Sequence, residues 1–170
     1  MFTKYLVFAA ASLAAAGAAP AQAPDRGLIR MSHAIGVAER HLSGRAMEAD
    51  LETRGGKLVY EIDLVRGDTL HRAQVDALSG KLVAVNKPRL ENWMLTWLDA
   101  DRLRLAVKAV PLAERLSQLE ERNHGEVKDV DFELAKGRGV YEIEFVTAAG
   151  VGKVRIDAAS GKRLELADID

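Results

Sequence analysis

The sequence repeats itself at a fixed spacing, and this constrains the fold more than any other feature. Residues 59–63 read Val-Tyr-Glu-Ile-Asp and return 81 positions later, at residues 140–144, as Val-Tyr-Glu-Ile-Glu. Residues 75–81 return at the same spacing as residues 156–162, and both copies contain Asp-Ala-x-Ser-Gly-Lys. Two separate blocks in one register indicate a duplicated structural unit. We call this fixed distance along the chain the repeat spacing.

Residues 1–21 have the pattern of a secretory signal peptide. Lys4 gives a positive start, residues 5–19 are uncharged and apolar, and small residues follow. Residues 19–21 (Ala-Pro-Ala) fit a cleavage site that leaves Gln22 first, and residues 21–23 (Ala-Gln-Ala) are the second candidate. The apolar run is shorter than the roughly 20 residues of a spanning helix, and the alternative is a buried N-terminal helix. We therefore expect a periplasmic or secreted protein with no stable membrane insertion after signal cleavage.

Composition excludes several classes of function. Without residues 1–21, the chain keeps 23 basic and 25 acidic side chains, a near-neutral balance that argues against a nucleic-acid partner. The chain has no cysteine, which removes disulfides, thiol chemistry and Cys-based metal sites. A half of about 60 to 80 residues is marginal for a separate core, so we expect the two halves to pack on each other.

Each repeat is predicted to be a helix followed by antiparallel strands. In the first repeat, Ser32 is the expected N-cap of a helix that ends at Ser43-Gly44. Alternating apolar residues and turn signals then predict four strands, at residues 46–53, 58–66, 69–77 and 81–85. The fold class is therefore α+β, with two tandem repeats that each pack a helix on an antiparallel meander of three to four strands.

The second repeat is expected to have a longer front end. Pro111 can open a helix that ends near residues 123–125. Ala-Glu-Arg occurs at residues 38–40 and again at residues 113–115, a spacing of 75 instead of 81. This match predicts six additional residues between the helix and the hairpin of the second repeat.

A two-residue turn at Gly67-Asp68 fixes the expected register of the hairpin. Tyr60 then faces Val75 and Asp63 faces Arg72. Transferred by the repeat spacing, the same register places Tyr141 opposite Ile156, Ile143 opposite Val154, Glu144 opposite Lys153 and Glu142 opposite Arg155. Alternation places the tyrosines on the core face, and places Glu61, Asp63 and Glu142 on a solvent face where exposed pairs contribute about 0.2–1 kcal/mol each.

The Tyr-Glu-Ile-acid strand, followed by a polar hairpin and Asp-Ala-x-Ser-Gly-Lys after an Ala-rich helix, resembles the PepSY domain. Residues 32–85 are similar to one copy and residues 111–166 to a second, more divergent one. The resemblance implies a helix on an antiparallel sheet in an exported or cell-surface protein. The family is named for propeptides of thermolysin-type metallopeptidases, where the domain is thought to inhibit the enzyme. This chain contains no His-Glu-x-x-His, so inhibition would act on a separate protein.

The expected organisation has four segments. They are a signal peptide (1–21), a first PepSY-like repeat (22–87), a linker (88–110) and a second repeat (111–170). The linker contains Trp93 and Trp97, whose spacing places them on one face of a helix. They either pack between the repeats or form a partner-binding patch.

The signature residues are predicted to be structural. Asp76 and Asp157 precede tight turns in which Gly80 and Gly161 can adopt positive φ, and Tyr60 and Tyr141 are expected as core aromatics with bonded hydroxyls. No catalytic residue is predicted, because Glu61 and Glu142 face basic or amide side chains. The four histidines do not have the spacing of a metal site, so no metal or cofactor is expected.

Three functional hypotheses remain. The first is an exported, non-enzymatic protein that binds a protein or peptide partner of the cell envelope, through strand edges or the Trp93/Trp97 region, and inhibits or modulates a peptidase or a sensor. The second is a small-ligand or metal-binding protein that uses a cleft between the repeats. The third is a hydrolase whose site has no recognisable pattern.

Overall fold

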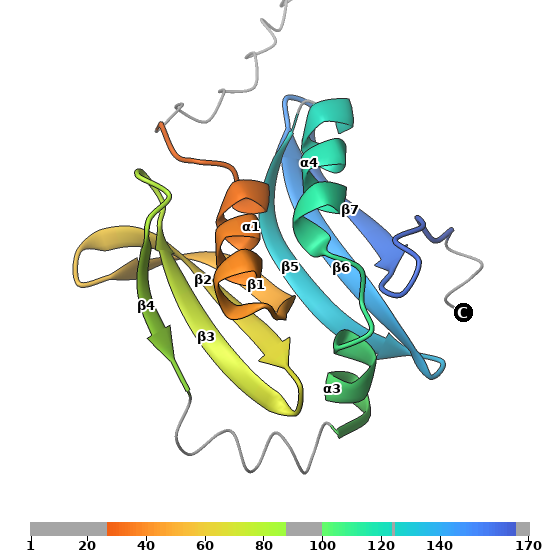
Figure 1. Cartoon of the computed structure of the whole chain (residues 1–170). Helices are drawn as coiled ribbons and strands as arrows, with labels where there is room; N and C mark the ends of the chain where they lie inside the picture. Colours follow the sequence, from red (N-terminus) through yellow and green to blue (C-terminus); the bar gives the residue numbers. More distant parts are fainter. Residues whose placement is uncertain (1–26, 88–99, 124, 166–170) are drawn as a thin grey trace, which may run out of the picture.

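The computed structural model describes residues 27–87, 100–123 and 125–165 (Figure 1). The predicted signal peptide, both tryptophans of the linker and His124 lie outside the described residues. Within these ranges, no helix combines the length and the apolar character that a membrane crossing requires.

A four-stranded unit and a three-stranded unit follow one another along the chain, each with one helix in front of its strands. A short additional helix lies between them. The elements are α1 (Met31–Leu42), β1 (Arg45–Arg54), β2 (Lys57–Arg66), β3 (Thr69–Asp76), β4 (Leu82–Asn86), α3 (Ala100–Ala106), α4 (Leu112–Asn123), β5 (Glu126–Ala135), β6 (Arg138–Thr147) and β7 (Gly150–Asp157).

All seven strands form one sheet, in the order β4-β3-β2-β1-β5-β6-β7. The helices lie over one face of this sheet, as Figure 1 shows, and α1 packs beside α4. The two repeats meet where β1 runs antiparallel to β5, with Ala49 opposite Val130 and Asp50 opposite Asp129. Ala49 and Val130 are separated by the repeat spacing, so equivalent positions face each other and the halves are related as in an isologous dimer.

The repeat has the same length in both halves. Helices α1 and α4 begin at Met31 and Leu112, and strands β1 and β5 begin at Arg45 and Glu126, so both pairs keep the repeat spacing. The six additional residues expected in the second repeat are therefore not present, and the Ala-Glu-Arg match was misleading. The apolar residues that face the sheet set the register of the helix, and Met31 and Leu112, both 0 % exposed, occupy equivalent positions.

The predicted hairpin registers are confirmed. Tyr60 faces Val75 and Asp63 faces Arg72 across β2 and β3. The second repeat follows the same register: Tyr141 faces Ile156, Ile143 faces Val154, Glu144 faces Lys153 and Glu142 faces Arg155. Side chains of both repeats belong to one buried cluster between the helices and the sheet, in which the rings of Phe132 and Tyr141 lie 5.2 Å apart, edge to face. A shared core of this kind compensates for the small size of each half.

The opposite face of the sheet carries charged side chains, but part of it is less exposed than expected. Glu61 and Asp63 are 8 % and 7 % exposed, so their prediction as solvent-exposed pairs was wrong. Arg72 covers both carboxylates: its Nε and one terminal nitrogen bond Asp63 at 2.7 and 2.8 Å, and its other terminal nitrogen lies 3.1 Å from Glu61. Paired arginines satisfy the carboxylates while their aliphatic stems exclude water.

Candidate functional site

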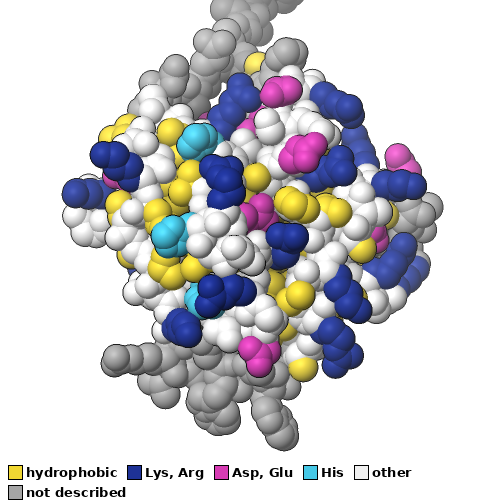
Figure 2. Space-filling view, viewed as in Figure 1, with side chains coloured by type: hydrophobic (Ala, Val, Ile, Leu, Met, Phe, Trp, Pro, Cys, Tyr) yellow, Lys and Arg dark blue, Asp and Glu magenta, His cyan; other side chains and the backbone are white. Residues whose placement is uncertain are grey.

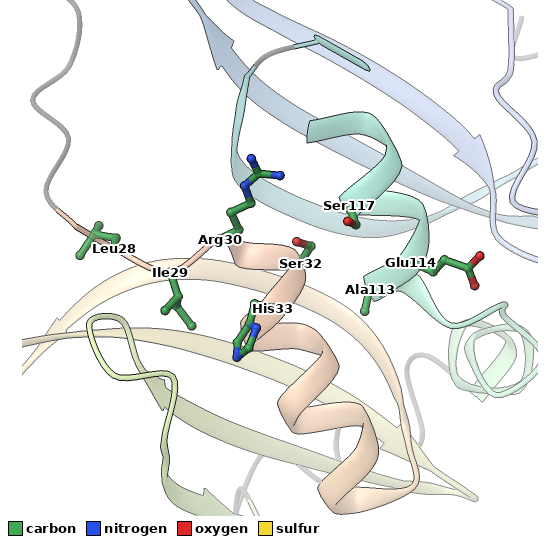
Figure 3. Close-up of a pocket in the computed structure, with 8 residues that line it drawn as sticks. All are labelled: Leu28, Ile29, Arg30, Ser32, His33, Ala113, Glu114 and Ser117. Atoms are coloured by element: carbon green, nitrogen blue, oxygen red, sulfur yellow. The ribbon is translucent and has the colours of Figure 1, made fainter. Parts of the chain in front are cut away.

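An open groove crosses the helix layer between the two repeats. Its volume is about 620 Å3, and it is bordered by the segment before α1, the first turn of α1 and the first two turns of α4 (Figure 3). The lining residues are Leu28, Ile29, Arg30, Ser32, His33, Ala113, Glu114 and Ser117. Because both repeats supply lining residues, the groove depends on the packing of one half against the other.

The segment before α1 forms one wall of the groove and is held by two hydrogen bonds. The backbone N–H of Ile29 donates to the carbonyl of Ala77 (2.8 Å), and the hydroxyl of Tyr60 donates to the carbonyl of Ile29 (2.6 Å). The first of these bonds has an equivalent in the second repeat, from Val110 to Ala158 (2.9 Å). The signature residue Tyr60 therefore positions the apolar wall, on which Figure 3 shows Leu28 and Ile29.

Ser32 is not the helix cap that its position predicted. Helix α1 begins at Met31, two residues earlier than a helix capped by Ser32, and its N-cap, Arg30, makes no side-chain capping bond. Ser32 lies within the first turn and donates its hydroxyl to Oε2 of Glu120, 2.5 Å away on α4. A carboxylate from the neighbouring helix thus lies at the start of α1, where the exposed N–H groups of a helix favour negative charge.

Glu120 is the most buried acid beside the groove. The residue is 3 % exposed, and its second oxygen, Oε1, has no hydrogen-bond partner among the described residues. Burial raises the pKa of Glu120, and the hydrogen bonds from Ser32 offset part of that effect. A buried carboxylate oxygen without a partner is costly, and native proteins contain few such groups.

Glu39 is the counterpart of Glu120 at the other end of the helix pair. Its Oε1 accepts the backbone N–H groups of Leu112 (3.3 Å), at the start of α4, and of Ala46 (3.2 Å), on β1. Burial raises the pKa of Glu39, and these backbone hydrogen bonds oppose the shift. Sequence reasoning missed both glutamates, although the repeat spacing that separates them was a signal that could have found them.

Two further bonds link the repeats beside Glu39. Arg45 donates through Nε to the carbonyl of Ala109 (2.9 Å), and the hydroxyl of Tyr141 donates to the carbonyl of Ala46 (2.7 Å). We call this region the bonded end of the helix pair and the region around Ser32 and Glu120 the groove end.

The two signature tyrosines are buried and bonded. Tyr60 is 2 % exposed and Tyr141 is 0 % exposed. Burial raises the pKa of Tyr60 to about 12 and raises the pKa of Tyr141 further, so both hydroxyls are protonated donors at neutral pH. They act on different partners: Tyr60 bonds within its own repeat and Tyr141 bonds across to the other.

The signature aspartates and glycines build two equivalent turns. Oδ1 of Asp76 accepts the backbone N–H (2.7 Å) and the hydroxyl (2.8 Å) of Ser79, and these bonds lower the pKa of Asp76. Oδ1 of Asp157 accepts the same pair from Ser160, at 2.8 and 2.7 Å. Gly80 and Gly161 follow with φ of 71° and 69°, values that glycine adopts without strain. These four residues lie in turns and not in the groove.

The signature glutamates lie on the open face of the sheet, away from the groove. Glu61 accepts hydrogen bonds from Arg54 (3.1 Å) and Gln74 (3.2 Å). Glu142 accepts them from Lys153 (2.7 Å) and Arg155 (2.8 Å), which lower the pKa of Glu142. The lone pairs of both carboxylates are engaged in these bonds, and Glu142 lacks the raised pKa of a general acid.

The histidines are dispersed over the described part of the chain. His33 lines the groove, His41 is exposed in the last turn of α1, and His71 is 3 % exposed opposite Leu64. Burial lowers the pKa of His71, and the charges of Arg66 and Lys87 lower it further. Among residues 27–87, 100–123 and 125–165, no three His, Asp or Glu side chains are grouped to hold a metal ion.

The surface around the groove is mixed in charge. In the orientation of Figure 1, Figure 2 shows Lys and Arg side chains spread over the helix-bearing face, with Asp and Glu side chains fewer. Among the lining residues, the charges of Arg30 and Glu114 offset each other. The buried carboxyl group of Glu120 lies behind this balanced lining and is bonded to the lining residue Ser32.

Two tandem α+β units that share one sheet define the class of this protein, and comparison with known proteins gives the family. The model of the PepSY family, described as peptidase propeptide and YPEB domain, matches residues 29–86 and again residues 108–165. These matches span more than half of the chain, so the protein belongs to the PepSY family.

Comparisons with whole proteins add little to this result. No curated protein matches the chain. A solved structure, described as that of a putative lipoprotein from Clostridium difficile 630, is similar over 84 % of this chain and 94 % of its own, at 15 % identity and a TM-score of 0.43.

Proposed function

We propose that this protein is an exported, non-enzymatic PepSY protein that binds a protein or peptide partner of the cell envelope. The signal-peptide pattern of residues 1–21 supports export. The bonds of Glu61 and Glu142 to basic and amide side chains support a role without catalysis. The groove between the repeats is the main support for the proposal, because it combines an apolar wall at Leu28 and Ile29 with polar groups from both halves. Pockets of this composition are typical of binding sites.

The shape of the groove favours a peptide over a small molecule. Sites for small molecules bury most of the ligand surface, whereas this groove is open along one side. An extended peptide can lie along such a groove and still make contacts on both walls. The second candidate, a small-ligand carrier, is tested by native mass spectrometry of freshly purified protein, where only a mass above that of the bare chain supports it.

The class of partner follows from the family. The domain is described as a peptidase propeptide, so an extracytoplasmic peptidase or an envelope sensor is the first partner to test. Strand edges offer a second contact surface, since β4 and β7 border the sheet and expose Val83 (55 %) and Val151 (66 %). Trp93 and Trp97 remain a predicted part of the partner surface.

A crosslinking pull-down from periplasmic extract tests the proposal. Residues 22–170 are the bait, and the intact mass of the exported chain shows whether Gln22 is its first residue. Glu114→Trp would block the groove, and Arg122→Trp is the control on the same helix, because both side chains are exposed and only Glu114 lines the groove. One dominant partner, lost with Glu114→Trp and kept with Arg122→Trp, supports the proposal. A folded chain that captures no partner contradicts it.

A further inference from the structure

The two ends of the helix pair are built from equivalent residues but differ in charge. Each position at the bonded end has a counterpart at the groove end, separated from it by the repeat spacing: Glu39 with Glu120, Tyr141 with Tyr60, and Arg45 with Glu126. The first two pairs conserve the side chain, whereas the third replaces a cation by an anion. The comparison therefore shows what the groove end lacks.

What the groove end lacks is a cation at the position equivalent to Arg45. At the bonded end, the guanidinium of Arg45 acts to lower the pKa of Glu39. At the groove end, the carboxylate of Glu126 acts to raise the pKa of Glu120, and Glu126 is itself bonded to Lys128 (2.8 Å). The guanidinium of Arg30, on the exposed rim of the groove, acts to lower the pKa of Glu120 and has a larger effect than Glu126.

The groove end also lacks a hydrogen-bond donor. Oε1 of Glu39 accepts two backbone N–H groups, from Leu112 and Ala46. Oε1 of Glu120 accepts none among the described residues, although Glu120 is only 3 % exposed. Glu120 does not itself line the groove, so it would act on a bound molecule through its charge and through Ser32, to which it is bonded.

The two hydroxyls of the groove are oriented to accept and not to donate. Ser32 commits its single hydroxyl proton to Glu120 (2.5 Å), and Ser117 commits its proton to Glu121 (3.3 Å). A serine whose proton is used in this way offers only lone pairs to a ligand. The polar floor of the groove is therefore complementary to N–H groups.

We propose that the groove binds one Lys or Arg side chain of the peptide partner, whose N–H groups bond Ser32 and Ser117 and whose charge is balanced by Glu120. This inference rests on the proposed function. Leu28, Ile29 and Ala113 supply apolar surface for the aliphatic stem of the bound side chain. The groove end favours a basic over an acidic ligand, because the start of α1, which would attract an anion, already holds a carboxylate. A single basic residue fits better than a basic run, since Figure 2 shows Lys and Arg across the surrounding face.

The test is an NMR titration of the 15N-labelled chain 22–170 with blocked pentapeptides at low salt. The probe is acetyl-Ala-Ala-Lys-Ala-Ala-amide, and its control has norleucine in place of lysine, which keeps the stem and removes the charge. We expect saturable shifts of the Ser32 and Ser117 amides with the lysine peptide, and binding about tenfold weaker with the norleucine peptide, as for loss of a charged hydrogen bond.

Two variants connect the effect to the proposed residues. Glu120→Gln keeps an acceptor for Ser32 and removes the charge, so the lysine peptide should bind about tenfold more weakly. Glu126→Arg places a cation at the position equivalent to Arg45, and its repulsion of the lysine side chain should also weaken binding. This second variant keeps the test valid if Glu120→Gln does not fold. Asp68→Arg makes the same change of charge in an exposed turn remote from the groove and should leave binding unchanged.

Three results would overturn the inference. They are equal binding of the norleucine peptide, wild-type binding by the folded glutamate variants, and no shift of groove amides with the lysine peptide. If an envelope partner is nevertheless captured and lost with Glu114→Trp, the proposed function stands and only the preference for a basic side chain is wrong.

Discussion

Glu39 and Glu120 occupy equivalent positions in the two repeats, and each bonds the first turn of the helix that carries the other. Glu39 on α1 accepts the N–H of Leu112 at the start of α4, and Glu120 on α4 accepts the hydroxyl of Ser32 at the start of α1. This reciprocity follows from two antiparallel helices related by the repeat. It links the halves by polar contacts on the helix side, while β1 and β5 link them in the sheet.

Removal of the Glu39 carboxylate should destabilise the protein. In Glu39→Ala, the buried N–H groups of Ala46 and Leu112 lose their acceptor, so we expect a loss of about 2–3 kcal/mol in the free energy of unfolding. Glu39→Gln retains an acceptor oxygen and removes a charge that burial disfavours, so its change should stay below about 1 kcal/mol. Urea unfolding measures both, and equal losses in the two variants would argue against the capping role.

The two signature tyrosines should differ when their hydroxyls are removed. Tyr141→Phe leaves the buried carbonyl of Ala46 without its donor and should cost about 1–2 kcal/mol. Tyr60→Phe frees the carbonyl of Ile29, which is half-buried and open to water, so it should cost about 0.5–1 kcal/mol. Chemical denaturation compares them, and a larger loss in Tyr60→Phe would contradict this ranking.

Two carboxylates should make stability depend on pH. Asp50 faces Asp129 where β1 meets β5. Burial, together with the neighbouring carboxylates of Glu52 and Glu61, raises the pKa of Asp50 to about 6, and burial and Asp131 raise the pKa of Asp129 to about 6. The folded chain therefore binds protons more tightly than the unfolded chain does, and stability should fall as the pH rises through about 6.

Asp50→Asn removes one of the two facing charges and tests this dependence. At pH 7.5 the variant should be more stable than the wild type by about 1 kcal/mol, a value reduced for solvent screening of half-exposed groups. Between pH 5 and pH 7.5 its stability should change less than that of the wild type, whereas Asp68→Asn, in an exposed turn, should follow the wild type. A steeper pH dependence in Asp50→Asn would contradict the assignment.

Gly139 makes room for the ring of Phe132. A Cβ at this position would lie 2.5 Å from Cζ of Phe132, inside the buried core. We expect Gly139→Ala to cost about 1–3 kcal/mol through overpacking. The smaller side chain of Phe132→Leu should reduce the penalty in the double variant, and a double-mutant cycle from thermal or urea unfolding measures this coupling. Additive losses would show that the two positions do not compete for space.

The sequence was a reliable guide where structure depends on local pattern. Alternation around Tyr60 and the Gly67-Asp68 turn predicted which residues pair, because a two-residue hairpin leaves one register that buries the apolar face. The same logic failed for Glu61 and Asp63, whose burial depends on how Arg54 and Arg72 fold over them. The predicted bounds of the second helix agree with α4, but its alignment with the first helix was wrong by six residues, because a three-residue match outweighed the positions of Leu112 and Leu116, which face the core.

The sequence by itself determined the duplication, the strands with their pairing, and the PepSY family, because each is set by residues close together in the chain or by one fixed spacing. Only the tertiary structure decided that the repeats share a single sheet through β1 and β5, that Glu39 and Glu120 bond each other's helices, and that a groove opens beside Ser32. These features join residues far apart in the chain. Their geometry depends on how two apolar faces pack, which local pattern does not encode.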